Sequence, residues 1–210
     1  MRTAWLALLL AAAAGSSDPL AVARRAAGQE RLECASSLET VMLALQLASP
    51  GPPRTEFQVQ ARARFAPQVN HPAVSETAAL VEAGFGLEQL ARLAALLSPA
   101  PAFRLSDSPE LAALAQHLPG ADIAFNQDRL HGYAKLVREF YWDNRLGQFL
   151  RESLPHYQQA LRQAPASRAP VGTRILISLL APLAPEGRLQ FERHAPRPVR
   201  YLILAPWNRR

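Results

Sequence analysis

The chain has 210 residues, with 23 basic and 17 acidic side chains, a formal net charge of +6 and a single cysteine. One cysteine excludes an intramolecular disulfide, and with it the class of small secreted domains that disulfides hold together. The length is sufficient for one domain that buries a hydrophobic core of its own.

The first 17 residues have the layout of a secretory signal peptide. Arg2 precedes an unbroken apolar run over residues 4–14, which ends in an Ala-x-Ala cleavage site at residues 12–14. The run is shorter than the ~20 apolar residues that a transmembrane helix needs. We therefore expect residues 1–17 to be removed and the mature protein to be exported, periplasmic or secreted, with no transmembrane segment after cleavage.

The excess positive charge lies in the last fifth of the chain. Residues 168–210 contain eight arginines and two acids, whereas residues 1–167 carry 15 basic and 15 acidic groups. Such a segment can mark a surface for an acidic protein or an anionic surface. Because the arginines are scattered, and Tyr201 and Trp207 form no stacking series, we do not expect specific nucleic-acid binding.

A helical domain is predicted over residues 35–164, after a mobile lead over residues 18–34. Apolar residues at helical spacing, capping residues and prolines define five to seven helices. The candidate segments are 36–48, 55–66, 72–82, 87–97, 108–117, 126–150 and 156–163.

The segment 36–48 carries the clearest helix signals. Ser36 or Ser37 can cap its first turn, and Glu39 lies where an acid stabilises the helix dipole. Apolar residues recur at helical spacing along the segment, at Leu38, Val41, Met42, Leu45 and Ala48.

The hydrophobic pattern changes period after a linker over residues 165–172. Segments 174–180, 189–191 and 199–204 read as strands. They predict a small antiparallel hairpin or sheet over residues 173–206. The expected fold is therefore mainly α followed by this sheet, in the α+β class.

Motifs for catalysis are missing from the sequence. No two histidines stand three or four residues apart, and no His-Glu-x-x-His occurs; the histidines are His71, His117, His131, His156 and His194. Glu152 and His156 are four apart, but Pro155 lies between them. There is no nucleophile elbow, phosphate loop or dinucleotide fingerprint. We accordingly predict no catalytic residue, no cofactor and no metal ligand in this chain.

Two features admit more than one interpretation. Cys34 fits a half-buried small apolar position, while a nucleophile or an intermolecular disulfide stays open. Residues 141–144, Tyr-Trp-Asp-Asn, form the densest polar-aromatic cluster. They are either a sugar- or peptide-binding edge or the solvent-facing flank of the long helix.

Several short motifs follow one another in a familiar order. They are the helix Leu38–Ala48, Phe65, His71–Val74, Gly84-Phe85-Gly86, Phe140–Asp143, Phe149-Leu150, His156-Tyr157 and the hairpin. This order, over about residues 33–206, resembles a family of exported bacterial proteins of unknown function. Fuller members of that family look like zinc-dependent peptidases.

The resemblance implies that this chain corresponds to a non-catalytic part of such a protein. In fuller members a His-Glu-x-x-His helix follows the hairpin, whereas Arg210 ends this sequence just after it. A zinc peptidase needs two helix histidines, a third ligand and a glutamate base. The resemblance therefore implies a truncated or degenerate relative, the non-catalytic N-terminal part of a zinc-peptidase-like protein.

Two alternatives stay open. One is a self-sufficient periplasmic binding module whose basic C-terminal hairpin meets an acidic partner or an anionic lipid surface. The other is a hydrolase that uses Cys34, or a histidine–carboxylate pair, in the helical core.

Overall fold

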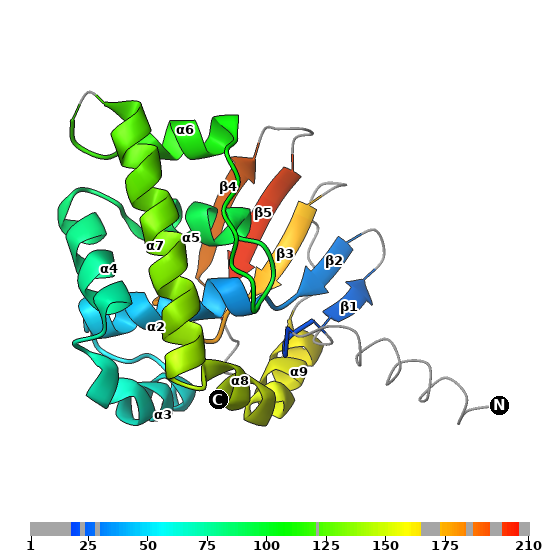
Figure 1. Ribbon diagram of the computed structural model, residues 1–210. Coiled ribbons are helices and arrows are strands. Elements are labelled where there is room, and N and C mark those ends of the chain that lie inside the picture. Colours follow the sequence, from blue (N-terminus) through cyan, green and yellow to red (C-terminus); the bar gives the residue numbers. More distant parts are fainter. Residues whose placement is uncertain are drawn as a thin grey trace.

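The computed structural model describes residues 18–21, 24–27, 30–120, 122–164, 173–183, 187–193 and 199–205. Over these residues it contains eight α-helices and a small five-stranded sheet (Figure 1). The predicted fold class, mainly α with a small sheet in an α+β arrangement, is thereby confirmed. The predicted signal peptide and the predicted linker over 165–172 lie outside the described residues.

The observed elements follow the predicted ones closely in the helical part. The helices are α2 (Ser36–Ala48), α3 (Glu56–Phe65), α4 (Pro72–Glu82), α5 (Leu87–Leu96), α6 (Pro109–Ala115), α7 (Ile123–Asp143), α8 (Leu146–Glu152) and α9 (Leu154–Gln163), with a short 3₁₀ turn η1 (Ala66–Gln68). The strands are β1 (Arg24–Ala27), β2 (Glu30–Glu33), β3 (Thr173–Ile177), β4 (Arg188–Arg193) and β5 (Val199–Leu204).

The long helix predicted over 126–150 is divided into α7 and α8. Arg145 adopts a left-handed backbone conformation, with φ of 50°, and α8 begins at the next residue. A right-handed helix cannot continue through such a residue. The Asn144 side chain donates to the carbonyl oxygen of Phe140 at 2.8 Å and satisfies one of the last carbonyls of α7.

The sheet is mixed, not antiparallel as predicted. Its strand order is β1-β2-β3-β5-β4. The pairs β1/β2 and β4/β5 are antiparallel, whereas β2/β3 and β3/β5 are parallel. The difference arises because β4 takes the outer edge and β5 then returns between β3 and β4, so that β3 does not pair with the strand that follows it.

The predicted mobile lead over 18–34 is replaced by two strands of this sheet. Leu32 of β2 lies opposite Ile175 of β3, and both side chains are fully buried. The Asp18 carboxylate accepts hydrogen bonds from the Leu20 amide at 2.9 Å and from the Ser36 hydroxyl at 2.5 Å. The Ser36 side chain therefore binds Asp18 at the start of this segment. It does not cap α2, which has no side-chain cap.

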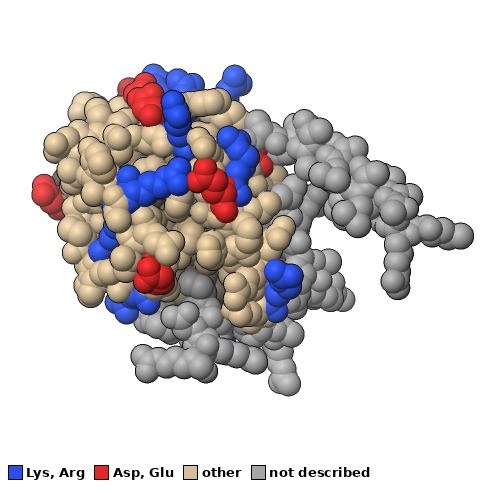
Figure 2. All heavy atoms as spheres, turned by 90° about the horizontal axis from the view of Figure 1, so that it is seen from below, with Lys and Arg blue, Asp and Glu red and all other residues tan. Residues whose placement is uncertain are grey.

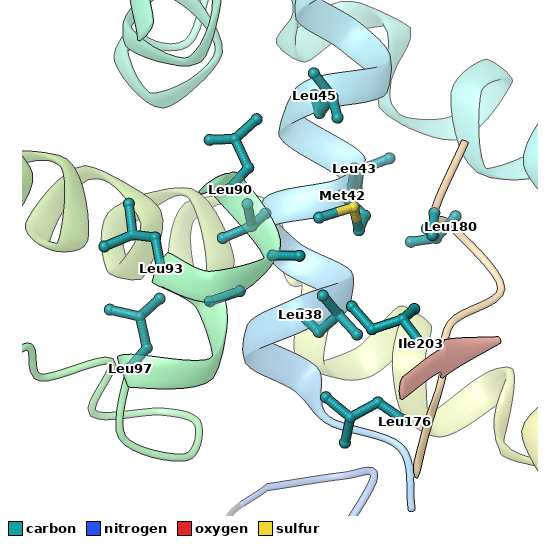
Figure 3. Close-up of a cluster of buried hydrophobic side chains, with 14 of the residues drawn as sticks. Leu38, Met42, Leu43, Leu45, Leu90, Leu93, Leu97, Leu176, Leu180 and Ile203 are labelled. Atoms are coloured by element: carbon teal, nitrogen blue, oxygen red, sulfur yellow. The ribbon is translucent and has the colours of Figure 1, made fainter. Parts of the chain in front are cut away.

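Helix α2 is buried almost all round and forms the centre of the molecule. It packs against α4, α5 and α7. Figure 3 shows Leu38 directed towards Leu176 and Ile203 of the sheet, while Leu90 and other leucines of α5 approach α2 from another side. Each such buried side chain contributes about 1.5–3 kcal/mol. This packing positions α2 and α5 over one face of the sheet.

Candidate binding cleft

A cleft runs between α5 and the sheet face that α5 covers. It consists of two pockets that share Ala95, Leu96 and Arg193. The larger, the polar pocket, has a volume of about 410 Å³, and its polar side chains are Asp18, Glu33, Cys34, Ser37, Arg174, Arg193 and Tyr201. The smaller, the apolar pocket, has a volume of about 240 Å³ and lies between α5, α6 and β4.

The register of the sheet places one cation and two aromatic rings side by side on this face. The register pairs Arg174 with Tyr201 and Tyr201 with Phe191. The Tyr201 and Phe191 rings stack with centroids 5.1 Å apart. The guanidinium of Arg174 lies 5.6 Å from the Tyr201 ring, and that of Arg92 in α5 lies 5.5 Å from the Phe191 ring. Such contacts stabilise a site by about 0.5–1 kcal/mol each and orient its cations.

Glu33 holds Arg174 at the floor of the polar pocket. The Nε of Arg174 donates to the Glu33 carboxylate at 2.7 Å, and its Nη1 donates to the Tyr201 hydroxyl at 3.4 Å. Burial acts to lower the pKa of Arg174, but the neighbouring Glu33 outweighs it and the net pKa is raised. Arg174 therefore stays cationic, and its side chain is 44% exposed to the pocket and the solvent.

Arg193 lies in the wall that the two pockets share, and one of its guanidinium donors is buried without a partner in the described part of the chain. Its Nε is buried and finds no hydrogen-bond partner within the described part of the chain. A buried donor without an acceptor costs about 1–3 kcal/mol. A bound ligand or an ordered water is one source of the missing acceptor.

Cys34 also lines the polar pocket, at 5% exposure. Burial raises the pKa of its thiol, and the negative charges of Glu39, Glu33 and Asp18 raise it further. The thiolate is the nucleophilic form of cysteine, so this environment opposes nucleophilic catalysis. The position is that of a buried small side chain.

Glu39 forms a separate polar centre behind the cleft. We name this centre the Glu39 cluster; it consists of Glu39, Ser178, Leu179 and Leu180. The fully buried carboxyl accepts hydrogen bonds from the Leu179 amide at 2.8 Å, the Leu180 amide at 3.1 Å and the Ser178 hydroxyl at 3.1 Å. Burial raises the pKa of Glu39 to about 8, although these hydrogen bonds act in the opposite direction. The cluster fastens the chain after β3 to α2.

Sequence reasoning placed Glu39 in the first turn of α2 but did not identify it as a buried group. The signal was nevertheless present, because apolar residues surround it on every side of the helix. The hydroxyl of Tyr157 is buried beside this carboxyl. The pKa of Tyr157 is raised, mainly because the hydroxyl is buried and to a smaller extent because Glu39 lies nearby.

The histidines do not converge on one site. His71 caps α4 by accepting from the Ala73 amide at 3.1 Å, His131 lies 2.8 Å from the Asp107 carboxylate, and His156 packs against the Phe57 ring. His117 lines the apolar pocket, and His194 lies outside the described residues. The described residues contain no group of three His, Cys, Asp or Glu side chains that could hold a metal ion.

Within its described residues, the predicted basic hairpin contains both ion-paired arginines and an exposed arginine, Arg188. Arg200 donates to Glu192 at 2.5 Å, and Arg174 is paired with Glu33 as described above. Arg188 is exposed at the start of β4. The described part of the hairpin therefore directs Arg174 and Arg193 into the cleft rather than forming a uniformly basic outer face.

None of the described helices combines the length and apolar character required to cross a bilayer. Comparisons of the chain with protein-family models, with curated proteins and with solved structures found no match.

Proposed function

We propose that this protein is an exported, non-catalytic binding protein whose cleft takes a short peptide with an apolar side chain beside a free carboxylate. The observation that carries the proposal is the buried Nε of Arg193, which finds no acceptor among the described residues. This donor lies where the polar and apolar pockets meet.

The two pockets offer complementary chemistry to such a peptide. Ala95, Leu96, Leu114 and Phe191 give the smaller pocket an apolar wall that an aliphatic side chain can fill. Arg193 and Arg174 stand beside it and offer charge-assisted hydrogen bonds to a carboxylate. Asp18 and Glu33, which also line the larger pocket, are already engaged with Ser36 and Arg174, so the exposed part of Arg174 and the Arg193 donor are the groups left for the peptide.

Titration calorimetry with the tripeptide Gly-Ala-Leu, and with its C-terminal amide, tests this proposal. Replacing Arg193→Met keeps the apolar stem and removes the donors, so we expect binding to weaken about tenfold or more. The C-terminal amide should bind the native protein about as weakly as the free tripeptide binds Arg193→Met. Arg188→Met, an exposed arginine on the same strand, is the matched control and should bind within about twofold of the native protein. Equal binding by Arg193→Met would contradict the proposal.

We also propose that the chain is the non-catalytic part of an exported zinc-peptidase-like protein, as its order of motifs suggests. A cleft suited to a peptide is compatible with that proposal, and the described residues offer no cluster of metal ligands. Elemental analysis of the purified full chain should find no stoichiometric zinc. A tightly bound zinc ion would contradict this assignment.

A further inference from the structure

A third hollow lies away from the cleft, at the break between α7 and α8. Its volume is about 340 Å³, and its lining consists of Pro101, Tyr141, Trp142, Arg145, Gly147, Gln148 and Arg151. We name it the Trp142 pocket. The Trp142 side chain is 59% exposed, which is unusual for so large an apolar group.

The floor of the Trp142 pocket is rigidly built. The buried Tyr141 ring packs between Phe103, at a centroid distance of 5.0 Å, and Trp142, at 5.9 Å. Gly147 lies directly against the Tyr141 hydroxyl, because a Cβ at residue 147 would come within 2.4 Å of that oxygen. The floor therefore fixes the Tyr141 ring, which the exposed indole of Trp142 contacts in an edge-to-face arrangement.

Two exposed arginines border the same pocket. Arg145 holds its left-handed conformation at φ 50°, which costs a residue with a Cβ about 1–2 kcal/mol and which glycine or asparagine would adopt at lower cost. Neither Arg145 nor Arg151 belongs to an ion pair among the described residues. A strained backbone that carries an unpaired cation into a pocket is a pattern typical of binding sites.

The lining of the Trp142 pocket carries positive charge only. It includes no acidic side chain, and the nearby Glu152 is already engaged with Arg64 at 2.7 Å and with Gln148 at 2.8 Å. Figure 2 views this end of the molecule, where α3, α8 and α9 lie, and shows Lys and Arg side chains interspersed with Asp and Glu side chains on its described surface. The lining of the pocket itself holds two arginines and no acid, which favours an anionic ligand.

We propose that the Trp142 pocket is a second binding site, for an acidic saccharide whose ring stacks on Trp142 and whose carboxylates pair with Arg145 and Arg151. The C–H face of a sugar ring is complementary to the electron-rich face of an indole. The planar guanidinium matches a carboxylate with two parallel hydrogen bonds.

Other anionic ligands fit this pocket less well. Single-stranded nucleic acid needs a series of stacking rings, whereas Trp142 is the one exposed aromatic ring in the lining of this pocket. A peptide of acidic residues alone, such as tetraglutamate, would use the arginines but has no ring face to place on the indole. The tests below therefore separate the saccharide from the acidic peptide.

Titration calorimetry with tetragalacturonate tests the site. Arg145→Gly removes the cation and relieves the left-handed strain, so this variant should fold at least as stably as the native protein and bind about tenfold more weakly. Trp142→Ala should weaken binding to a similar degree. Arg54→Ala, an exposed arginine outside the pocket, is the matched control and should bind within about twofold of the native protein.

Three results would overturn the proposal. They are native binding by the folded Arg145→Gly variant, no measurable binding of tetragalacturonate at low salt, and equally tight binding of tetraglutamate, which would identify an acidic-peptide site. Arg193→Met should bind tetragalacturonate like the native protein. A failure at this pocket is thus distinguishable from a failure at the cleft.

Discussion

The Glu39 cluster and the cleft at Arg193 each bury polar atoms of an ionisable side chain, but the fold satisfies those atoms differently. In the Glu39 cluster, a fully buried carboxyl receives three hydrogen bonds from the chain after β3. In the cleft, Arg193 holds a buried Nε that receives no acceptor from the described residues.

This difference distinguishes buried groups that stabilise the fold from buried groups that are available to a ligand. A buried polar group whose partners all come from the fold contributes to one packed arrangement of the core. A buried donor left without a partner lowers stability until something else supplies an acceptor. On this basis we propose that Glu39 is a structural group and that Arg193 is a ligand-binding group. The predictions below examine this contrast, from the largest effect to the smallest.

Removal of the Glu39 carboxyl should give the largest loss of stability. Glu39→Ala leaves two buried amides and the Ser178 hydroxyl without their acceptor. We expect the free energy of unfolding, measured in urea, to fall by about 3–5 kcal/mol. A loss below about 1 kcal/mol would mean that the cluster does not hold the chain after β3.

The same carboxyl should make stability depend on pH. Its pKa of about 8 in the folded protein exceeds the value of 4.5 in the unfolded chain. The folded state therefore keeps a proton that the unfolded state releases, so stability is full below pH 4.5 and is lost as pH rises through 8. Between pH 5 and 8 the loss should be on the order of 3 kcal/mol.

Unfolding in urea at both pH values checks this dependence. Glu39→Gln carries no titratable proton and should show a flatter profile over the same range. A native profile that is already flat would indicate that the carboxyl is ionised in the folded protein.

Substitutions at two glycines should have opposite effects. Gly147→Ala places a Cβ against the Tyr141 hydroxyl and should lower the free energy of unfolding by about 1–3 kcal/mol. Gly132→Ala, inside α7 with no atom within 4 Å of the new Cβ, should raise it by about 0.5–1 kcal/mol. Thermal and urea unfolding of the two variants would measure this contrast, and equal effects would contradict the packing at Tyr141.

Removal of a surface ion pair should give the smallest effect. Arg64 and Glu152 lie 2.7 Å apart, with 44% and 47% of their side chains exposed. We expect Arg64→Ala to lower the free energy of unfolding by less than about 1 kcal/mol, since exposed pairs contribute little. A larger loss would show that the contact of Arg64 with the Phe149 ring is structural.

Local signals in the sequence predicted the helical part well. Residues 36–48 form α2 at the predicted bounds, the Thr55 side chain caps α3 at the start of the predicted segment 55–66, and Pro72 occupies the first turn of α4. These features depend on neighbours within one or two turns of the chain, which periodicity and capping preferences describe.

Features that depend on distant partners were missed. The strand β2 exists because β3 pairs with it, and Glu33 meets Arg174 across 141 positions of the chain. Likewise, Arg145 gives no sequence signal for a helix break, because arginine is an ordinary helix former. The cleft unites α5, β4 and residues near Asp18, so no local motif could reveal it.

The most direct test of the contrast between the two regions is the free energy of unfolding of Arg193→Met in the absence of ligand. Because the Nε of Arg193 has no acceptor within the described part of the fold, the account predicts a value within about 0.5 kcal/mol of the native protein, or higher. A loss of more than about 2 kcal/mol would show that Arg193 is a structural group like Glu39, and would contradict the account.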